Sequence, residues 1–300
     1  MSTTYSALMV IAASLLWGTT GTIAHSIGGV ISPLTIGAVT MGVGGLILAA
    51  MSWSGVRDIL LDQKARRWAV WGGLGVVVYP LGFYTGMDLA GVAVGNILAL
   101  GTGPIVGALL EWRLDRKKPT TGWWVATITG VNGVILISTS NHSGTTADSE
   151  LFGVGVAVAL LAGVGYGVFS YAMGRIIDAG HSALASAGAT FGVGSIPLLV
   201  IVAVSAPAIL AAPGSWVGLS YLVLGPMVIS YVLYSRAMKR LSSSSVLTIA
   251  LTEPAVATLL AVWIVGERFD LTGALGIVLI ALAVIGATRS AAERNNPSSI

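Results

Sequence analysis

One carboxylate lies in the middle of a long apolar run. Glu253 is the only charged residue between positions 243 and 265, and Pro254 follows it. A charged side chain at the centre of a bilayer costs about 3 kcal/mol on insertion scales, so it must be paired, protonated, hydrogen-bonded or in contact with a wet cavity. Pro254 also removes a backbone donor. Glu253 is therefore either a cavity group that binds a substrate ammonium or carries a proton, or a structural carboxyl tied to a neighbouring helix.

Aromatic side chains occur deep in several other apolar runs. Trp17 is too far into the first run for an interfacial tryptophan, and a buried indole N–H needs a partner or a cavity. Tyr79 and Phe83 are four residues apart, so they share one helical face. We predict that these residues and Glu253 line one chamber together with Thr20, Asn96, Tyr166, Phe169, Ser230, Tyr231, Tyr234 and Thr252.

The composition of such a chamber indicates which kind of solute it can bind. Aromatic walls with several hydroxyl groups and one carboxylate suit an amphipathic solute of about the size of an amino acid. The alternative for each aromatic residue is packing against lipid or a neighbouring helix. The alternative for Asn96, Ser230 and Thr252 is a hydrogen bond from helix to helix, which is the more common role of such residues in membranes.

The elements that position these residues are long apolar runs. Charged residues make up 9% of the chain, against about 25% in soluble domains. A run of about 20 apolar residues is long enough to span a bilayer as a helix. The chain contains ten such runs, which predict an all-α integral membrane protein with ten transmembrane helices: 5–24, 33–53, 68–87, 90–111, 121–139, 151–173, 183–204, 214–236, 243–265 and 270–288.

The basic residues orient these helices. With the N-terminus in the cytoplasm, every Lys and Arg except Arg268 lies in a cytoplasmic gap or in the tail, as the positive-inside rule requires. The longest outer loop, residues 141–150, contains Asp148 and Glu150 and no basic residue. The third and fourth runs are separated only around Asp88, so nine spans are an alternative, but nine would break the charge asymmetry. Both termini are therefore predicted to be cytoplasmic.

The chain also repeats itself after 150 residues. The shift superimposes Tyr84 on Tyr234, Thr102 on Thr252 and Pro104 on Pro254. Residues 1–143 and 144–300 then form two five-helix repeats within one membrane unit. Because five is odd, the second repeat enters the membrane inverted, as in many secondary transporters. Gly103 stands at the position equivalent to Glu253, so the carboxylate occurs in one repeat only.

Several motifs carry a family resemblance. They are Trp17-Gly18 in the first run, Glu253-Pro254 in the ninth, Gly266-Glu267-Arg268 after it and Gly276 in the tenth. With them the chain resembles the drug/metabolite transporter superfamily in its ten-helix, EamA-like branch, and within it the bacterial YddG-type exporters of aromatic and other amino acids. The resemblance implies a secondary transporter that exports amino acids, aromatic ones included, across the bacterial inner membrane by alternating access. The alternative is an exporter of other small metabolites or drugs of the same superfamily.

Other classes of protein fit poorly. An intramembrane enzyme needs clustered acids, histidines or a nucleophile within the spans, and only Glu253 is available. The three histidines lie in or near loops and cysteine is absent, so we expect no metal and no cofactor. The basic residues are spread over short loops, which disfavours nucleic acid as a partner. The expected partners are the lipid bilayer and a small-molecule substrate, and the oligomeric state stays open. The tail beyond Ser290 is predicted to be a short disordered end.

Overall fold

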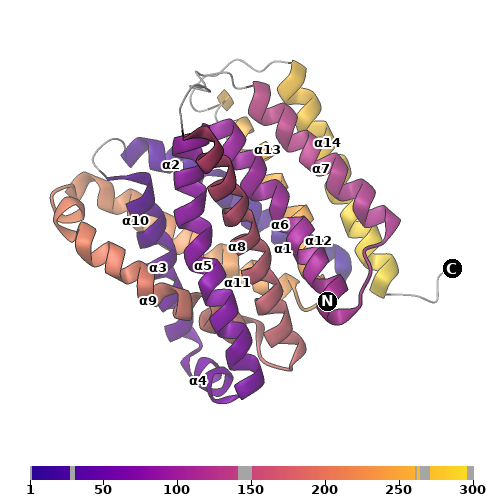
Figure 1. Cartoon of the computed structure of the whole chain (residues 1–300), viewed down its shortest axis with the longest axis horizontal. Helices are drawn as coiled ribbons and strands as arrows, with labels where there is room; N and C mark the ends of the chain where they lie inside the picture. Colours follow the sequence, from indigo (N-terminus) through magenta and orange to yellow (C-terminus); the bar gives the residue numbers. More distant parts are fainter. Residues whose placement is uncertain (1, 28–30, 141–150, 261, 264–270, 296–300) are drawn as a thin grey trace.

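The computed structural model describes residues 2–27, 31–140, 151–260, 262–263 and 271–295 (Figure 1). Within these residues the secondary structure is helical and includes no strand. Nine helical segments of the described part are long and apolar enough to cross a membrane. The predicted all-α integral membrane fold is therefore confirmed.

The first half of the chain contains five spans, the first of which consists of α1 with α2, and the short helix α4 between the second span and the third. Its helices are α1 (Thr3–Gly18), α2 (Thr20–Ile27), α3 (Pro33–Met51), α4 (Trp53–Leu61), α5 (Gln63–Ala90), α6 (Val92–Asp115) and α7 (Thr121–Ser140).

The second half repeats this order. Its elements are α8 (Phe152–Asp178), α9 (Ala183–Leu210), the short 3-10 turn η1 (Pro213–Ser215), α10 (Trp216–Leu222), the π-helical segment η2 (Val223–Ile229), α11 (Ser230–Ala237), α12 (Ser243–Ala250), α13 (Thr252–Leu260) and α14 (Leu271–Asn295). The segments α10, η2 and α11 follow one another directly and form one span, as do α12 and α13.

The third predicted span is the helix α5, which is not among the nine most apolar segments. It has 28 residues and is about 42 Å long, more than the thickness of a bilayer core. Its glycines, tyrosines and charged first turn lower its mean hydropathy. Gly91 separates it from α6 with a φ of 88°, a left-handed conformation that glycine adopts without steric cost. One glycine is therefore enough to end one span and begin the next, and α5 with the nine apolar segments gives ten spans within the described residues.

The packing of the helices is two-fold symmetric. The helix α5 packs on α8 and α9, and its counterpart in the second half, η2 with α11, packs on α1 and α3. In the same way α6 packs on α8, and α12 with α13 packs on α1. In the pairs α3–α9, α6–α12 and α7–α14, a helix of the first half packs on the equivalent helix of the second half, as expected around a two-fold axis. Figure 1 shows α7 beside α14.

The two halves are inverted relative to each other. Trp17 of α1 bonds Pro226 of η2, and Ala13, one turn earlier, accepts a hydrogen bond from Ser230, one turn later. The helix α1 is therefore antiparallel to η2 and α11. The helix α11 leads to Lys239 and α8 leads to Arg175, and these two residues line the same pocket at one end of the bundle. Because α1 is antiparallel to α11, α1 begins at the end where its counterpart α8 finishes. The predicted inverted repeat is confirmed, while the boundary predicted at 143–144 lies outside the described residues.

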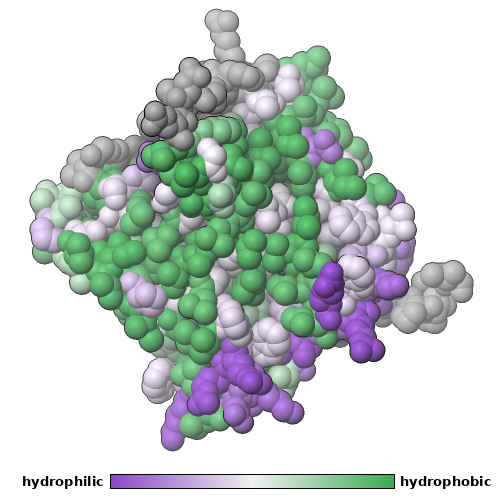
Figure 2. Space-filling model, viewed as in Figure 1, coloured by the Kyte–Doolittle hydropathy of each residue, from purple (hydrophilic) through white to green (hydrophobic). Residues whose placement is uncertain are grey.

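Basic segments from both halves meet at one end of the bundle. Arg175 bonds Asp115 at 2.9 Å, and Arg294 donates to the carbonyl of Lys118 at 3.0 Å. Lys117 and Lys239 line the same pocket. We call this the basic end. Figure 2 shows hydrophilic residues gathered at the lower end of the molecule below an apolar flank.

The C-terminal helix corrects one expectation. We predicted a disordered end beyond Ser290, but α14 continues to Asn295. Arg294 is held there because its guanidinium bonds Glu111, Ser242 and the carbonyl of Lys118. These partners lie far from Arg294 in sequence, so the apolar pattern alone did not indicate that the last turns would be ordered.

Close contact between α7 and α14 depends on two glycines. A Cβ atom added to Gly133 would lie 2.7 Å from the carbonyl oxygen of Gly276, and a Cβ atom on Gly276 would lie 2.7 Å from the carbonyl of Gly133. Small residues allow such close approach of helix backbones in lipid, where van der Waals packing drives association. The Gly276 of the family motif is thus a packing residue.

The variant Gly133→Val is expected to push these helices apart and to lower the free energy of unfolding by about 1–3 kcal/mol, the usual cost of overpacking. Thermal unfolding of purified protein in detergent measures it. Gly153→Val is the matched control, because a Cβ at Gly153 meets no described atom within 4 Å. Equal unfolding temperatures for the two variants would contradict the packing role.

Candidate substrate chamber

A small chamber lies between the two halves, near the middle of the spans that line it. Its volume is about 90 Å³. The helices α1, α2, α3 and α5 of the first half and α8, η2, α11 and α13 of the second all contribute to it. The residues that line it are Trp17, Thr20, Gly37, Thr40, Met41, Tyr79, Pro80, Phe83, Tyr84, Tyr166, Pro226, Met227, Tyr231 and Glu253.

The indole of Trp17 forms one wall and has a fixed position. Its Nε1 donates a 2.7 Å hydrogen bond to the carbonyl of Pro226, and the side chain is only 8% exposed. The acceptor lies in the π-helical segment η2, and such segments often occur at functional sites. The Trp17 ring lies 5.2 Å from that of Tyr231. The two requirements of a deep tryptophan, a partner for its N–H and contact with a cavity, are both met.

The aromatic face of α5 forms the opposite wall. The ring of Tyr79 lies 5.6 Å from Phe83 and 5.0 Å from Tyr166 of α8. Tyr84 continues this wall, with its ring 5.5 Å from Phe83. Pro80 lies inside this helix, so the wall is built at a position where the backbone ladder is interrupted.

Glu253 supplies the only ionisable carboxylate of the lining. It lies in the first turn of α13, directly after α12 ends and before Pro254. Within the described part of the chain, no hydrogen bond or ion pair involves its carboxylate. Because Pro254 has no N–H, the carbonyl of Ala250 also lacks its usual helical donor. The chamber thus includes a carboxylate that has no protein partner among the described residues.

The structure brings together seven of the twelve predicted site residues: Trp17, Thr20, Tyr79, Phe83, Tyr166, Tyr231 and Glu253. It places five outside the lining. Phe169 and Tyr234 are fully buried, and the hydroxyl of Tyr234 bonds Ser170 at 2.7 Å. They lie one turn closer to the basic end than Tyr166 and Tyr231, so they form a layer between the chamber and that end.

The other three outlying residues are polar. Ser230 donates to the carbonyls of Ala13 and Gly225, and Thr252 donates to the carbonyl of Ile249. Their hydroxyls satisfy backbone acceptors at and between helices, which is the alternative role that the sequence left open. Asn96 lies in the first turns of α6 and does not line the chamber.

Sequence reasoning missed half of the lining. Tyr84 follows Phe83 directly, so a face defined by the spacing of Tyr79 and Phe83 alone was too narrow. The small and apolar residues Gly37, Met41 and Met227, and Thr40, carry no signal of their own in an apolar run. Pro80 and Pro226 did carry one, because a proline inside a span interrupts its helix.

A buried polar network at the basic end was also missed. Glu111 of α6 is 4% exposed and accepts hydrogen bonds from the backbone N–H and the hydroxyl of Ser244, both at 2.8 Å. Ser244 is in the first turn of α12, where a carboxylate is favourable to the helix dipole. Arg294 of α14 lies 3.4 Å from the same carboxylate. Glu111 therefore ties α6, α12 and α14 together.

Glu111→Ala is expected to lower the free energy of unfolding by about 2–4 kcal/mol, because it leaves buried donors at the start of α12 without an acceptor. Arg294→Ala is expected to cost less than about 1 kcal/mol, since a partly exposed ion pair contributes little. Thermal unfolding of both variants in one detergent compares them. An equal or larger effect of Arg294→Ala would contradict the central position of Glu111.

The comparisons with known proteins agree with this architecture. An inverted repeat with interrupted helices around a polar chamber is typical of secondary transporters. The EamA-like transporter family matches the chain twice, over residues 4–139 and 153–289. The chain therefore belongs to the EamA-like transporter family, and it is a multi-pass membrane transporter rather than an enzyme.

Two individual proteins illustrate the relationship. The uncharacterized transporter YwfM of Bacillus subtilis (strain 168) is 30% identical over 289 residues, which cover 93% of this chain and 92% of that protein. A protein of known crystal structure has the same fold, with a TM-score of 0.75 and 22% identity over 95% of this chain and 96% of that one. The predicted resemblance to the EamA-like branch is thereby confirmed, whereas the motif Gly266-Glu267-Arg268 lies outside the described residues.

Proposed function

We propose that this protein exports amino acids, aromatic ones included, across the bacterial inner membrane by alternating access. The observation that carries the proposal is the Glu253 carboxylate, which lies in an aromatic chamber at mid-membrane and has no partner among the described residues. Both termini are cytoplasmic in this proposal, because the positive-inside rule assigns the basic end to that side.

An α-amino acid matches the chemistry of the chamber. Its ammonium group is the complement of the Glu253 carboxylate. Its side chain packs against Trp17, Tyr79 and Tyr166, which bind flat apolar groups well. The hydroxyl of Thr20 is available to the substrate carboxylate. We propose on the same grounds that the chain functions like the YddG-type exporters that it resembles.

The chamber must change its size during transport. Its volume of about 90 Å³ is below the range of about 300–1,000 Å³ that is common for small-molecule sites. The interruptions at Thr19, between α1 and α2, and at Leu251, between α12 and α13, together with the π-helical turn η2, are places where the spans can bend. Residues 1–143 and 144–300 are the two halves that rock about the chamber in this mechanism.

The conformation described is closed toward the basic end. The layer of Phe169 and Tyr234 is fully buried, with Phe191 of α9 packed against Phe169, and the Glu111 network joins three helices below it. In the proposed cycle this layer and this network separate when the chamber opens to the cytoplasm.

The second candidate is export of other small metabolites or cationic drugs. The lone carboxylate of Glu253 favours any cation with an apolar body, with or without a carboxylate of its own. The lining includes no Lys or Arg, which disfavours phosphate-bearing substrates such as nucleotide sugars.

Transport by the purified protein in liposomes tests the proposal. A panel of radiolabelled amino acids is compared with a cationic dye, with and without a proton gradient, and empty liposomes give the background. Saturable flux of aromatic amino acids that unlabelled amino acids compete with is the expected result. Flux of the dye alone, without competition by amino acids, would favour the second candidate and overturn the first.

A further inference from the structure

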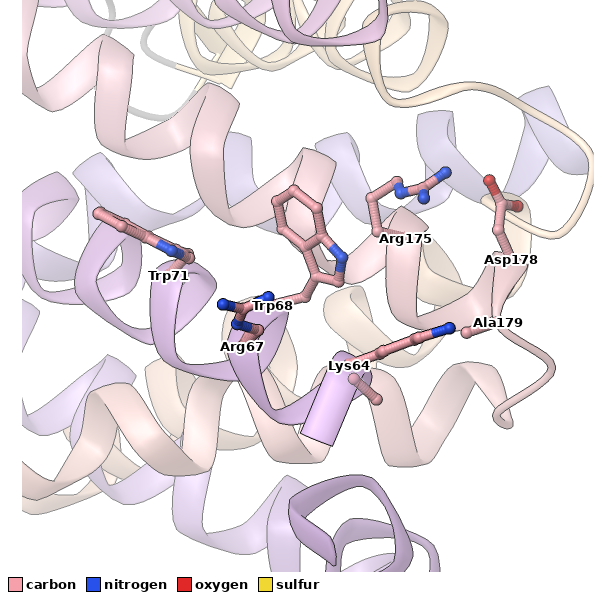
Figure 3. A pocket seen from close by; sticks show the side chains of 8 residues that line it. Lys64, Arg67, Trp68, Trp71, Arg175, Asp178 and Ala179 are labelled. Carbon is pink, nitrogen blue, oxygen red and sulfur yellow. The ribbon is translucent and has the colours of Figure 1, made fainter. Parts of the chain in front are cut away.

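A pocket at the basic end lies apart from the substrate chamber. It is formed by the first turns of α5 and the last turn of α8, and its volume is about 600 Å³. Its lining includes three cations, Lys64, Arg67 and Arg175, against one carboxylate, Asp178. Two indoles, Trp68 and Trp71, complete it. Figure 3 shows Trp68 between the guanidinium groups of Arg67 and Arg175, with Trp71 farther along α5.

The pocket lies at the level of the lipid headgroups. From Val70 onward, α5 exposes large apolar side chains to the surroundings, with Trp71 60% and Leu74 52% exposed. Lys64 and Arg67 precede this apolar surface by one or two turns, which is about 5–10 Å along the helix. Tryptophan on the apolar side and basic residues on the polar side mark the membrane–water boundary.

The cationic side chains of the pocket have N–H donors that no described residue accepts from. Lys64 and Arg67 are exposed, and no hydrogen bond or ion pair of their side chains occurs within the described residues. One nitrogen of Arg175 bonds Asp115 at 2.9 Å, and its guanidinium lies 5.8 Å from the ring of Trp68. The Nε of Arg175 is buried and has no acceptor among the described atoms. The pocket thus presents unneutralised positive charge beside an apolar wall.

We infer that this pocket binds the headgroup of one anionic phospholipid from the leaflet at the basic end. Lys64, Arg67 and Arg175 hold the phosphate by charge-assisted hydrogen bonds. Trp71 and the apolar surface of α5 contact the beginning of the acyl chains. A zwitterionic choline headgroup is disfavoured because it adds the positive charge of its ammonium group to a pocket that already contains three cations. Basic pockets between membrane helices bind anionic headgroups for the same reason.

The test compares two double variants of equal charge. Lys64→Gln with Arg67→Gln removes two cations of the pocket. Arg57→Gln of α4 with Arg66→Gln of α5 removes two exposed cations nearby in the sequence that do not line the pocket. Native mass spectrometry of the full-length protein in detergent measures retention of phosphatidylglycerol, phosphatidylcholine and phosphatidylethanolamine, each titrated separately.

The wild type and the control variant are expected to retain one phosphatidylglycerol. The pocket variant is expected to bind it about 25-fold more weakly, since each basic residue near the surface contributes about fivefold. Equal retention by the pocket variant, an equal loss in the control, or equal retention of either zwitterionic lipid would overturn the inference. Displacement of the lipid by millimolar inorganic phosphate would identify a free-anion site instead and would also overturn it.

Folding of the variants is checked by thermal unfolding. The side chains of Lys64 and Arg67 are exposed, so the double variant is expected to unfold at the wild-type temperature. If it does not, the single variants Lys64→Gln and Arg67→Gln replace it, each with an expected loss of about fivefold. Unchanged lipid retention in both folded single variants would overturn the inference.

Discussion

Glu253→Gln is expected to reduce transport about 10- to 150-fold without lowering the unfolding temperature. The amide keeps the shape of the side chain but loses the charge, and a hydrogen bond to a charged group contributes about 1.5–3 kcal/mol. No described residue pairs with the carboxylate, so the fold loses no stabilising contact. Uptake into proteoliposomes and thermal unfolding of the same preparation measure both quantities.

A neighbouring residue provides the control for this variant. Thr252→Val changes a side chain of the same turn that donates to Ile249 and does not line the chamber, so transport is expected to stay within about twofold, the effect of well under 1 kcal/mol. A stability loss in Glu253→Gln with normal transport by the folded fraction would establish the structural role of the carboxyl and remove it from the substrate site.

Trp17→Phe is expected to reduce transport of aromatic amino acids about fivefold, the value of one net hydrogen bond, and to affect alanine transport less. Phenylalanine keeps part of the ring surface but loses the donor to Pro226, so this wall of the chamber is no longer fixed. Trp17→Ala is expected to have a larger effect on transport and also to destabilise the fold by about 3–5 kcal/mol, because truncation of a buried tryptophan leaves a cavity.

The two substitutions at Trp17 therefore separate function from stability. Transport of tryptophan and alanine in the same liposomes gives the selectivity, and thermal unfolding gives the stability. Trp124→Phe is the matched control, since Trp124 of α7 is 42% exposed and lies outside the chamber. Equal loss of tryptophan and alanine transport in Trp17→Phe would contradict the proposed contact between the indole and the substrate side chain.

The sequence predicted the spans correctly, but it did not predict which side chains of each span line the chamber. All ten runs correspond to helical segments, although Gly91 rather than Asp88 separates the third from the fourth. Within the spans, Tyr234 and Ser230 face partners on α8 and α1 instead of the chamber. The structure places Trp17 and Glu253 in the lining of the chamber. The sequence indicated both residues because a deep indole or carboxylate is costly in an apolar run without a special environment.

The sequence by itself determined the number of spans, the inverted repeat, the common end of the basic segments and the two residues most unusual at their depth. These properties depend on hydropathy, charge and spacing, which are read along one chain. Only the tertiary structure decided which face of each helix meets the chamber, that Glu111 ties α6 to α12, and that Arg294 holds the last turn of α14. Those outcomes depend on how each helix rotates and crosses its neighbours, and contacts between segments more than 100 residues apart set that rotation.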